Sequence, residues 1–198
     1  TRHEIRPAFV VQLTFVQKLF VASVAGALLT LAYAPFDLFW VAPLSYAVLF
    51  YIWRGLRPVQ AFWSGFVFGC ASFFAGIHWV YVSIHDFGQV HPLLAASITL
   101  TLVVFLASYI AFTGWVAARW VTTDGPWAWF AVLPALSVLT EWCRGWLFSG
   151  FGWLAVGYSQ TDSWLMGYAP LGGVYPMSWV ALITAGALLG IAFGVFRM

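Results

Sequence analysis

The residues best able to do chemistry in this sequence are Glu141 and Arg144, in the segment EWCRGW that begins at Glu141. They are an acid and a base three positions apart, a spacing that places both side chains on one face of a helix and allows an ion pair. Such a pair would lower the cost of burying either charge in a bilayer. Arginine is also planar and always charged, so Arg144 is equally suited to grip a phosphate or carboxylate of a lipid-like ligand. The two interpretations are compatible, and we keep both.

Aromatic residues surround this pair and allow two interpretations. They are Trp142, Trp146, Trp153, Trp164, Tyr158 and Tyr168. A belt of tryptophan and tyrosine is typical of any membrane interface. However, glycines at 145, 150, 152 and 157 let the chain turn sharply, and the polar residues 159–162 add hydrogen-bonding groups. These features favour a shaped pocket.

Other groups with chemical potential are weaker candidates. His78, His85 and His91 lie near Asp86, but their spacing matches no metal-ligand pattern, so we expect hydrogen-bonding histidines and no metal. Cys143 is two residues from Glu141, and helix neighbours two apart point in different directions, so we interpret it as a packing residue. No phosphate-binding glycine loop is present, because no strand precedes the glycines. The sequence therefore predicts no cofactor and no catalytic residue.

The composition places these residues in a membrane. The chain has 198 residues, of which 63% are hydrophobic and 7% charged, against roughly 25% charged in soluble proteins. The net charge of +2 is scattered, which excludes a nucleic-acid partner and leaves the lipid bilayer as the surrounding medium. Two cysteines, Cys70 and Cys143, lie in apolar runs and predict no disulfide framework.

The hydrophobic runs predict an all-α, polytopic membrane helical bundle that forms a single domain over residues 1–198. From Leu19 to Phe36 no charge occurs, and a helix rising ~1.5 Å per residue over that length nearly covers a ~30 Å hydrocarbon core. Glycines at 65 and 69, and at 186, 190 and 194, predict close helix contacts. Six spans are expected, at about 15–35, 38–53, 59–81, 93–118, 127–147 and 177–196.

The basic residues predict the orientation, because short cytoplasmic loops are enriched in lysine and arginine. With six spans, seven of the eight basic residues fall on one side, namely Arg2, Arg6, Lys18, Arg54, Arg57, Arg119 and Arg197. Only Arg144 falls on the other. Both ends are therefore expected to be cytoplasmic, and the loops at Pro35, 78–92 and 144–176 are expected to face outward.

Four motifs add a family resemblance. LAYAPFD from Leu31, HWVYVSIHDFG from His78, EWCRGW from Glu141 and GWLAVGYSQTD from Gly152 resemble, in order and interval, the membrane part of bacterial apolipoprotein N-acyltransferase. The resemblance runs from about the first span to the end of the chain. One departure is Gly152, where that family often has proline.

The resemblance implies an acyltransferase that moves an acyl chain from a phospholipid to the amino group of the lipidated N-terminal cysteine of a diacylated lipoprotein. It implies a bacterial inner membrane location with periplasmic loops. In that family the chemistry passes through a thioester on a nitrilase-like domain that supplies Cys, Glu and Lys. The only lysine here is Lys18, at the predicted cytoplasmic start of the first span. We therefore expect this chain to be an N-terminal membrane portion without the catalytic triad.

By resemblance, the surface that docks lipid and lipoprotein would be lined by seven residues. They are Glu141, Arg144, Trp146, Trp153, Tyr158, Trp79 and Tyr81. A different hypothesis is a stand-alone lipid-binding or scaffold protein without enzymatic activity. A small transporter is disfavoured, because the spans hold almost no charged group at mid-bilayer.

Overall fold

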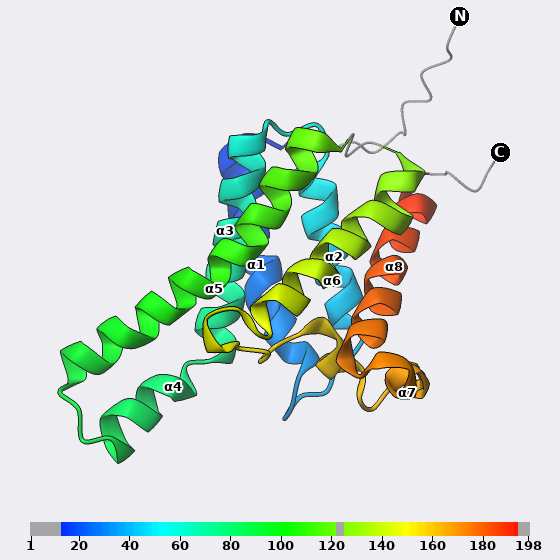
Figure 1. Ribbon diagram of the computed structural model, residues 1–198. Coiled ribbons are helices and arrows are strands. Elements are labelled where there is room, and N and C mark those ends of the chain that lie inside the picture. The colour runs from blue at the N-terminus through cyan, green and yellow to red at the C-terminus, as the bar shows by residue number, and fades with distance from the viewer. Residues whose placement is uncertain (1–12, 122–124, 194–198) are drawn as a thin grey trace, which may run out of the picture.

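The computed structural model describes residues 13–121 and 125–193, and every regular element in these ranges is helical (Figure 1). This confirms the all-α prediction. The long helices are α1 (Phe15–Leu29) with its extension η1 (Thr30–Ala32), α2 (Val41–Trp53), α3 (Pro58–Gly76), α5 (Pro92–Trp120), α6 (Leu133–Arg144) preceded by η3 (Ala128–Val132), and α8 (Val174–Ala192). The end of the sixth predicted span, from Gly194 onward, lies outside the described residues. The basic residues Arg2, Arg6 and Arg197 also lie outside them.

Four of these helical segments are long and apolar enough to cross a membrane: Phe15–Ala32, Pro58–Gly76, Pro92–Trp120 and Val174–Ala192. Helix α2 is apolar but shorter, and α6 reaches span length only together with η3. Each of the six predicted spans thus corresponds to a helical segment. The number that crosses the bilayer remains a prediction.

The remaining elements are short. They are α4 (Trp79–Val82), η2 (Ser83–Phe87), η4 (Leu147–Ser149), η5 (Val156–Gln160), η6 (Trp164–Tyr168) and α7 (Ala169–Gly172). Helix α3, in the span expected over 59–81, ends at Gly76, and the interval 78–92, expected to connect two spans, contains α4 and η2. Helix α8 begins at Val174 rather than at about Met177, because Pro176 in the first turn lacks only an N–H that would be unbonded anyway.

The most extensive helix packing is that of α3 against α1 and α5. A Cβ atom at Gly26 would stand 2.2 Å from the carbonyl oxygen of Phe68, and one at Gly69 would stand 2.8 Å from the Cα of Ala107. On the other side of the molecule, a Cβ at Gly186 of α8 would stand 2.1 Å from the carbonyl oxygen of Trp129. The glycines therefore let helix backbones touch, as the small-residue spacing predicts.

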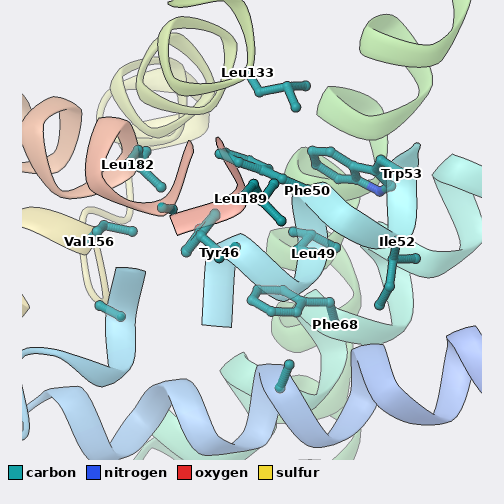
Figure 2. Packing of buried hydrophobic residues seen from close by; sticks show 14 of the residues in the cluster. Tyr46, Leu49, Phe50, Ile52, Trp53, Phe68, Leu133, Val156, Leu182 and Leu189 are labelled. Carbon is teal, nitrogen blue, oxygen red and sulfur yellow. The ribbon is translucent and has the colours of Figure 1, made fainter. Parts of the chain in front are cut away.

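The main apolar core is centred on α2, whose side chains pack against α1, α3 and α8 (Figure 2). Phe50 and Trp53 of α2 are fully buried, and Tyr46 lies edge-to-face with Phe68 of α3, with ring centroids 5.5 Å apart. Val156, from the segment after α6, is fully buried in the same cluster as Leu182 of α8. The core thus reaches from the helices into the loop that follows α6.

The basic residues of the helices divide between the two ends of the bundle. The N-termini of α1 and α3 and the C-termini of α2, α5 and α8 lie at one end of the bundle (Figure 1). Lys18, Arg54, Arg57 and Arg119 are located at these termini. The opposite end, where α6 ends and where α4 and α7 lie, is called the loop end. Arg144, in the last turn of α6, is at the loop end. The described basic residues follow the predicted alternation, whereas the side of the membrane that each end faces remains a prediction.

Candidate functional site

Helix α6 presents one face to the interior, and this face carries the charged pair. Its buried positions are Leu133, Pro134, Ser137, Glu141 and Arg144, which recur at helical spacing. Glu141 is 7% exposed and Arg144 is 4% exposed, although both are charged residue types. Side chains of this kind are almost never so buried without partners. Their partners therefore define what the pair does.

Glu141 and Arg144 both lie in the part of the chain that the structure describes, and their charged atoms are more than 4 Å apart. They therefore do not form an ion pair. The expected pairing was wrong. Instead, Glu141 Oε1 accepts a hydrogen bond of 2.8 Å from the backbone N–H of Val156. Arg144 Nη1 donates to the carbonyl oxygens of Phe151, at 2.7 Å, and Trp153, at 2.6 Å. Both side chains thus bind the backbone of the segment that follows α6.

We call this segment, residues 144–157, the anchored loop. Its first turn is closed by a hydrogen bond of 2.8 Å from the N–H of Phe151 to the carbonyl of Arg144. Gly150 has a φ of 72°, and a Cβ there would stand 2.1 Å from the carbonyl oxygen of Gly145. Only glycine fits this position, since other residues would meet both a backbone clash and a left-handed conformation. The sequence predicted a sharp turn at Gly150, and the turn observed there requires glycine.

Three further hydrogen bonds tie this region to other elements. The hydroxyl of Tyr33, beyond α1, donates to the carbonyl of Leu154 at 3.0 Å. Gln160 Nε2 donates to the carbonyl of Phe39 at 3.0 Å, and the N–H of Gly157 donates to Ser178 Oγ of α8 at 2.7 Å. The polar residues predicted to line a pocket are in part structural, because Gln160 is buried and bonded to the segment before α2.

The aromatic residues lie on the exposed side of the same loop. The Trp153 ring is half-exposed and lies 5.5 Å from that of Trp79, so two distant motifs meet here. Trp146 is half-exposed and pairs with Trp142 at 5.2 Å, whereas Tyr81 contacts His85 at 5.5 Å. Of the seven predicted site residues, Trp79 and Trp153 are in contact, and Glu141 and Arg144 lie buried beneath the loop. Tyr158 is half-exposed on η5, and no ring contact joins it to the described aromatics.

A small cavity of about 20 Å³ lies beneath the anchored loop. Its lining comes from α1, α2, α3, α5, α6 and the loop, and includes Ser137, Thr140, Glu141 and Arg144. The guanidinium carbon of Arg144 is 5.2 Å from the centroid of the Phe73 ring, a favourable cation–π distance. The interpretation from sequence missed Ser137. Its position one helical turn before Glu141 was the available signal.

The histidines and cysteines have local roles among the described residues. His78 Nδ1 lies 2.9 Å from the carbonyl of Ala75, His85 Nδ1 lies 2.8 Å from the carbonyl of Val90, and His91 accepts from the N–H of Leu93 at the start of α5. Cys70 and Cys143 are both free thiols.

The fold and the site define a helical membrane protein in which a buried acid and a buried base hold an aromatic loop. The model of the apolipoprotein N-acyltransferase N-terminal domain matches residues 25–187, and the chain belongs to this family. It is 42% identical over 168 residues to the apolipoprotein N-acyltransferase of Methylococcus capsulatus, covering 85% of this chain and 33% of that protein.

Two further relatives with the same name agree. The protein of Nitrosomonas europaea is 42% identical over 173 residues, covering 86% of this chain and 35% of its own length. The protein of Coxiella burnetii is 44% identical over 169 residues, covering 84% and 35%. The chain therefore spans about a third of the length of the curated relatives it matches.

Proposed function

We propose that this chain is the membrane part of an apolipoprotein N-acyltransferase, a bacterial acyltransferase. The complete enzyme transfers an acyl chain from a phospholipid to the N-terminal lipidated cysteine of a diacylated lipoprotein. Within it, this chain docks the lipid donor and the lipoprotein acceptor at the loop end. Family membership and the four ordered motifs support this proposal.

The observation that carries the proposed docking role is the way Trp153 is held. Its carbonyl oxygen is fixed by the buried Arg144, while its ring is half-exposed beside the ring of Trp79. Tryptophan and tyrosine combine an apolar body with a polar tip, which suits contact with lipid at a membrane interface. A fixed aromatic pair therefore presents a lipid-facing surface at low conformational cost.

The seven candidate residues divide into two roles in this proposal. Trp79, Tyr81, Trp146, Trp153 and Tyr158 form the aromatic surface, which contacts the substrates. Glu141 and Arg144 are positioning residues, because their side chains are buried and bind loop backbone. An arginine that grips a lipid phosphate directly would need an exposed guanidinium, so the positioning role fits Arg144 better.

The chain by itself is proposed to be inactive. Its only lysine, Lys18, is in the first turn of α1 at the end of the bundle opposite the loop end, so a Cys, Glu and Lys triad cannot assemble beside the aromatic surface. Acyl transfer from phospholipid to a diacylated lipopeptide, measured with this chain alone in liposomes, tests the claim. Sustained turnover would refute it.

The docking role is tested in the full-length protein that carries this domain. We expect Arg144→Ala to reduce lipopeptide acylation strongly, whereas Arg57→Ala, at the opposite end of the bundle, leaves it nearly unchanged. We expect Trp153→Ala to reduce acylation more than Trp164→Ala, which removes an exposed tryptophan outside the seven residues. Equal activities within either pair, at equal expression of folded protein, would contradict the proposed surface.

We also propose that the protein resides in the bacterial inner membrane with its loop end in the periplasm. A single cysteine at Phe148, which is 82% exposed, should react with a membrane-impermeant maleimide in spheroplasts. A cysteine at the exposed Trp120, at the end of α5, should react only after lysis. Cys70 and Cys143 are replaced by alanine in both. Labelling with the opposite pattern would reverse the orientation.

A further inference from the structure

The cavity beneath the anchored loop contains two polar atoms that lack a partner. Glu141 Oε2 and Ser137 Oγ are buried, and within residues 13–121 and 125–193 neither has a partner at hydrogen-bond geometry, although the Ser178 hydroxyl lies near the Glu141 carboxylate. Both residues line the cavity, and both are more than nine-tenths buried, with Ser137 at 6% exposed. The other carboxylate oxygen, Oε1, is already bonded to the N–H of Val156.

A buried oxygen of this kind is costly to leave unbonded, and nearly all such groups in proteins have a partner. Glu141 and Ser137 are four positions apart on α6, so they are neighbours on one helix face. Two orphaned atoms in adjacent turns that line one cavity indicate a ligand that satisfies both. The cavity and the orphaned atoms are independent observations, and both point to the same position.

The lining restricts the chemistry of this ligand. A carboxylate and a guanidinium, those of Glu141 and Arg144, both border the cavity. An anion would be repelled by the former and a cation by the latter, so a neutral molecule fits best. The cavity of about 20 Å³ exceeds the roughly 10–15 Å³ that one water needs, so a water molecule fits this position.

We propose that this cavity is a binding site for one ordered water molecule, which donates a hydrogen bond to Glu141 Oε2 and accepts one from the Ser137 hydroxyl. The water orients the Glu141 carboxylate, and the carboxylate in turn holds the N–H of Val156. One bound water thus helps to hold the anchored loop in place from below. It does not depend on the proposed enzymatic function, because it concerns how the loop is held.

The first test removes the Ser137 hydroxyl and observes the loop amide. With the water present, Ser137→Ala removes one of its partners, so hydrogen exchange at the Val156 amide should accelerate about tenfold and the melting temperature should fall by about 2–4 °C. If the cavity is dry, the same change deletes an unbonded hydroxyl, so the melting temperature stays the same or rises and the exchange rate is unchanged. That result would overturn the proposal.

A matched control is Ser64→Ala in α3. Its hydroxyl is also fully buried, but it donates to the carbonyl of Ala61 at 3.0 Å. This change should leave exchange at Val156 unaltered, whatever it does to overall stability. If both variants accelerate exchange at Val156 equally, the effect is not specific to the cavity and the proposal fails.

A direct structural test covers the case in which a variant does not fold. An experimental structure of the unaltered protein, at a resolution that shows other ordered waters, should contain density at hydrogen-bond distance from both Glu141 Oε2 and Ser137 Oγ. A direct hydrogen bond between these two atoms, or density absent from a cavity of the same shape, would overturn the proposal.

Discussion

The seam where α3 packs against α1 and α5 and the anchored loop at 144–157 both bring backbone atoms into close contact, but by different chemistry. In the seam, the contact exists because side chains are absent at Gly26 and Gly69. In the loop, it exists because the long side chains of Glu141 and Arg144 reach the backbone and bond to it.

The difference reflects what each region must satisfy. Helix backbones bond within themselves, so two helices in a membrane need only shape to associate. An irregular loop at the end of a bundle has free N–H and C=O groups, and these must find partners where water is excluded. A buried acid and a buried base supply an acceptor and a donor for that purpose. The seam should therefore be sensitive to added volume, and the loop to lost polar atoms.

The largest effect is expected in the seam. Gly26→Val would place a Cβ 2.2 Å from the carbonyl oxygen of Phe68, and backbone atoms cannot move aside as a side chain can. We expect a loss of more than about 3 kcal/mol, seen as little folded protein in size-exclusion chromatography. Gly167→Val is the control, because a Cβ there meets no atom within 4 Å. Normal yield for the Gly26 variant would show that the seam can open.

Arg144→Ala should have the next largest effect, and it tests the polar half of the comparison. It removes two hydrogen bonds from a charged donor and leaves the carbonyls of Phe151 and Trp153 without it. We expect a loss of about 3 kcal/mol in the free energy of unfolding, and faster proteolysis within 144–157. Arg119→Ala, at an exposed position, should change neither. Equal stability of the two variants would show that the guanidinium does not hold the loop.

Tyr33→Phe should have a smaller effect, because it removes a single neutral hydrogen bond to the carbonyl of Leu154. We expect a loss of about 1 kcal/mol, measured by thermal unfolding in detergent. Tyr158→Phe, in which the ring is half-exposed, should be close to neutral. A larger loss for Tyr158 than for Tyr33 would contradict the assigned anchor.

Gly152→Ala should have the smallest effect and the opposite sign. The backbone there is outside the left-handed region, and a Cβ meets no atom within 4 Å, so alanine mainly restricts the unfolded chain. We expect a gain of about 0.4–1 kcal/mol in stability. Gly150→Ala, two residues earlier, should instead destabilise the protein. Changes of the same sign at both positions would mean that loop geometry does not decide the outcome.

Much of this arrangement could be predicted from the sequence. Charge-free runs indicated the helices, glycine spacing indicated the close contacts of α3, and the separation of Glu141 and Arg144 placed both on one face. These features depend on local periodicity, which a sequence displays directly.

The partners of Glu141 and Arg144 could not be predicted in the same way. Their partners are backbone atoms of Val156, Phe151 and Trp153, and every residue carries such atoms, so no residue type marks them. The nearest charge of opposite sign was the natural but wrong expectation. Helix η2 was missed because His85 and Asp86 gave the segment the polarity of a loop.

The contact between Gly157 and Ser178 has a mechanical consequence. The N–H of Gly157 is held by a hydroxyl on the second turn of α8, at a point where no Cβ would fit against the carbonyl of Val174. A rotation of α8 by one residue, about 100° around its axis, would swing that hydroxyl away. The position of the loop therefore depends on the rotation of α8 about its axis. A rotation of this helix would also displace the residues of the aromatic surface.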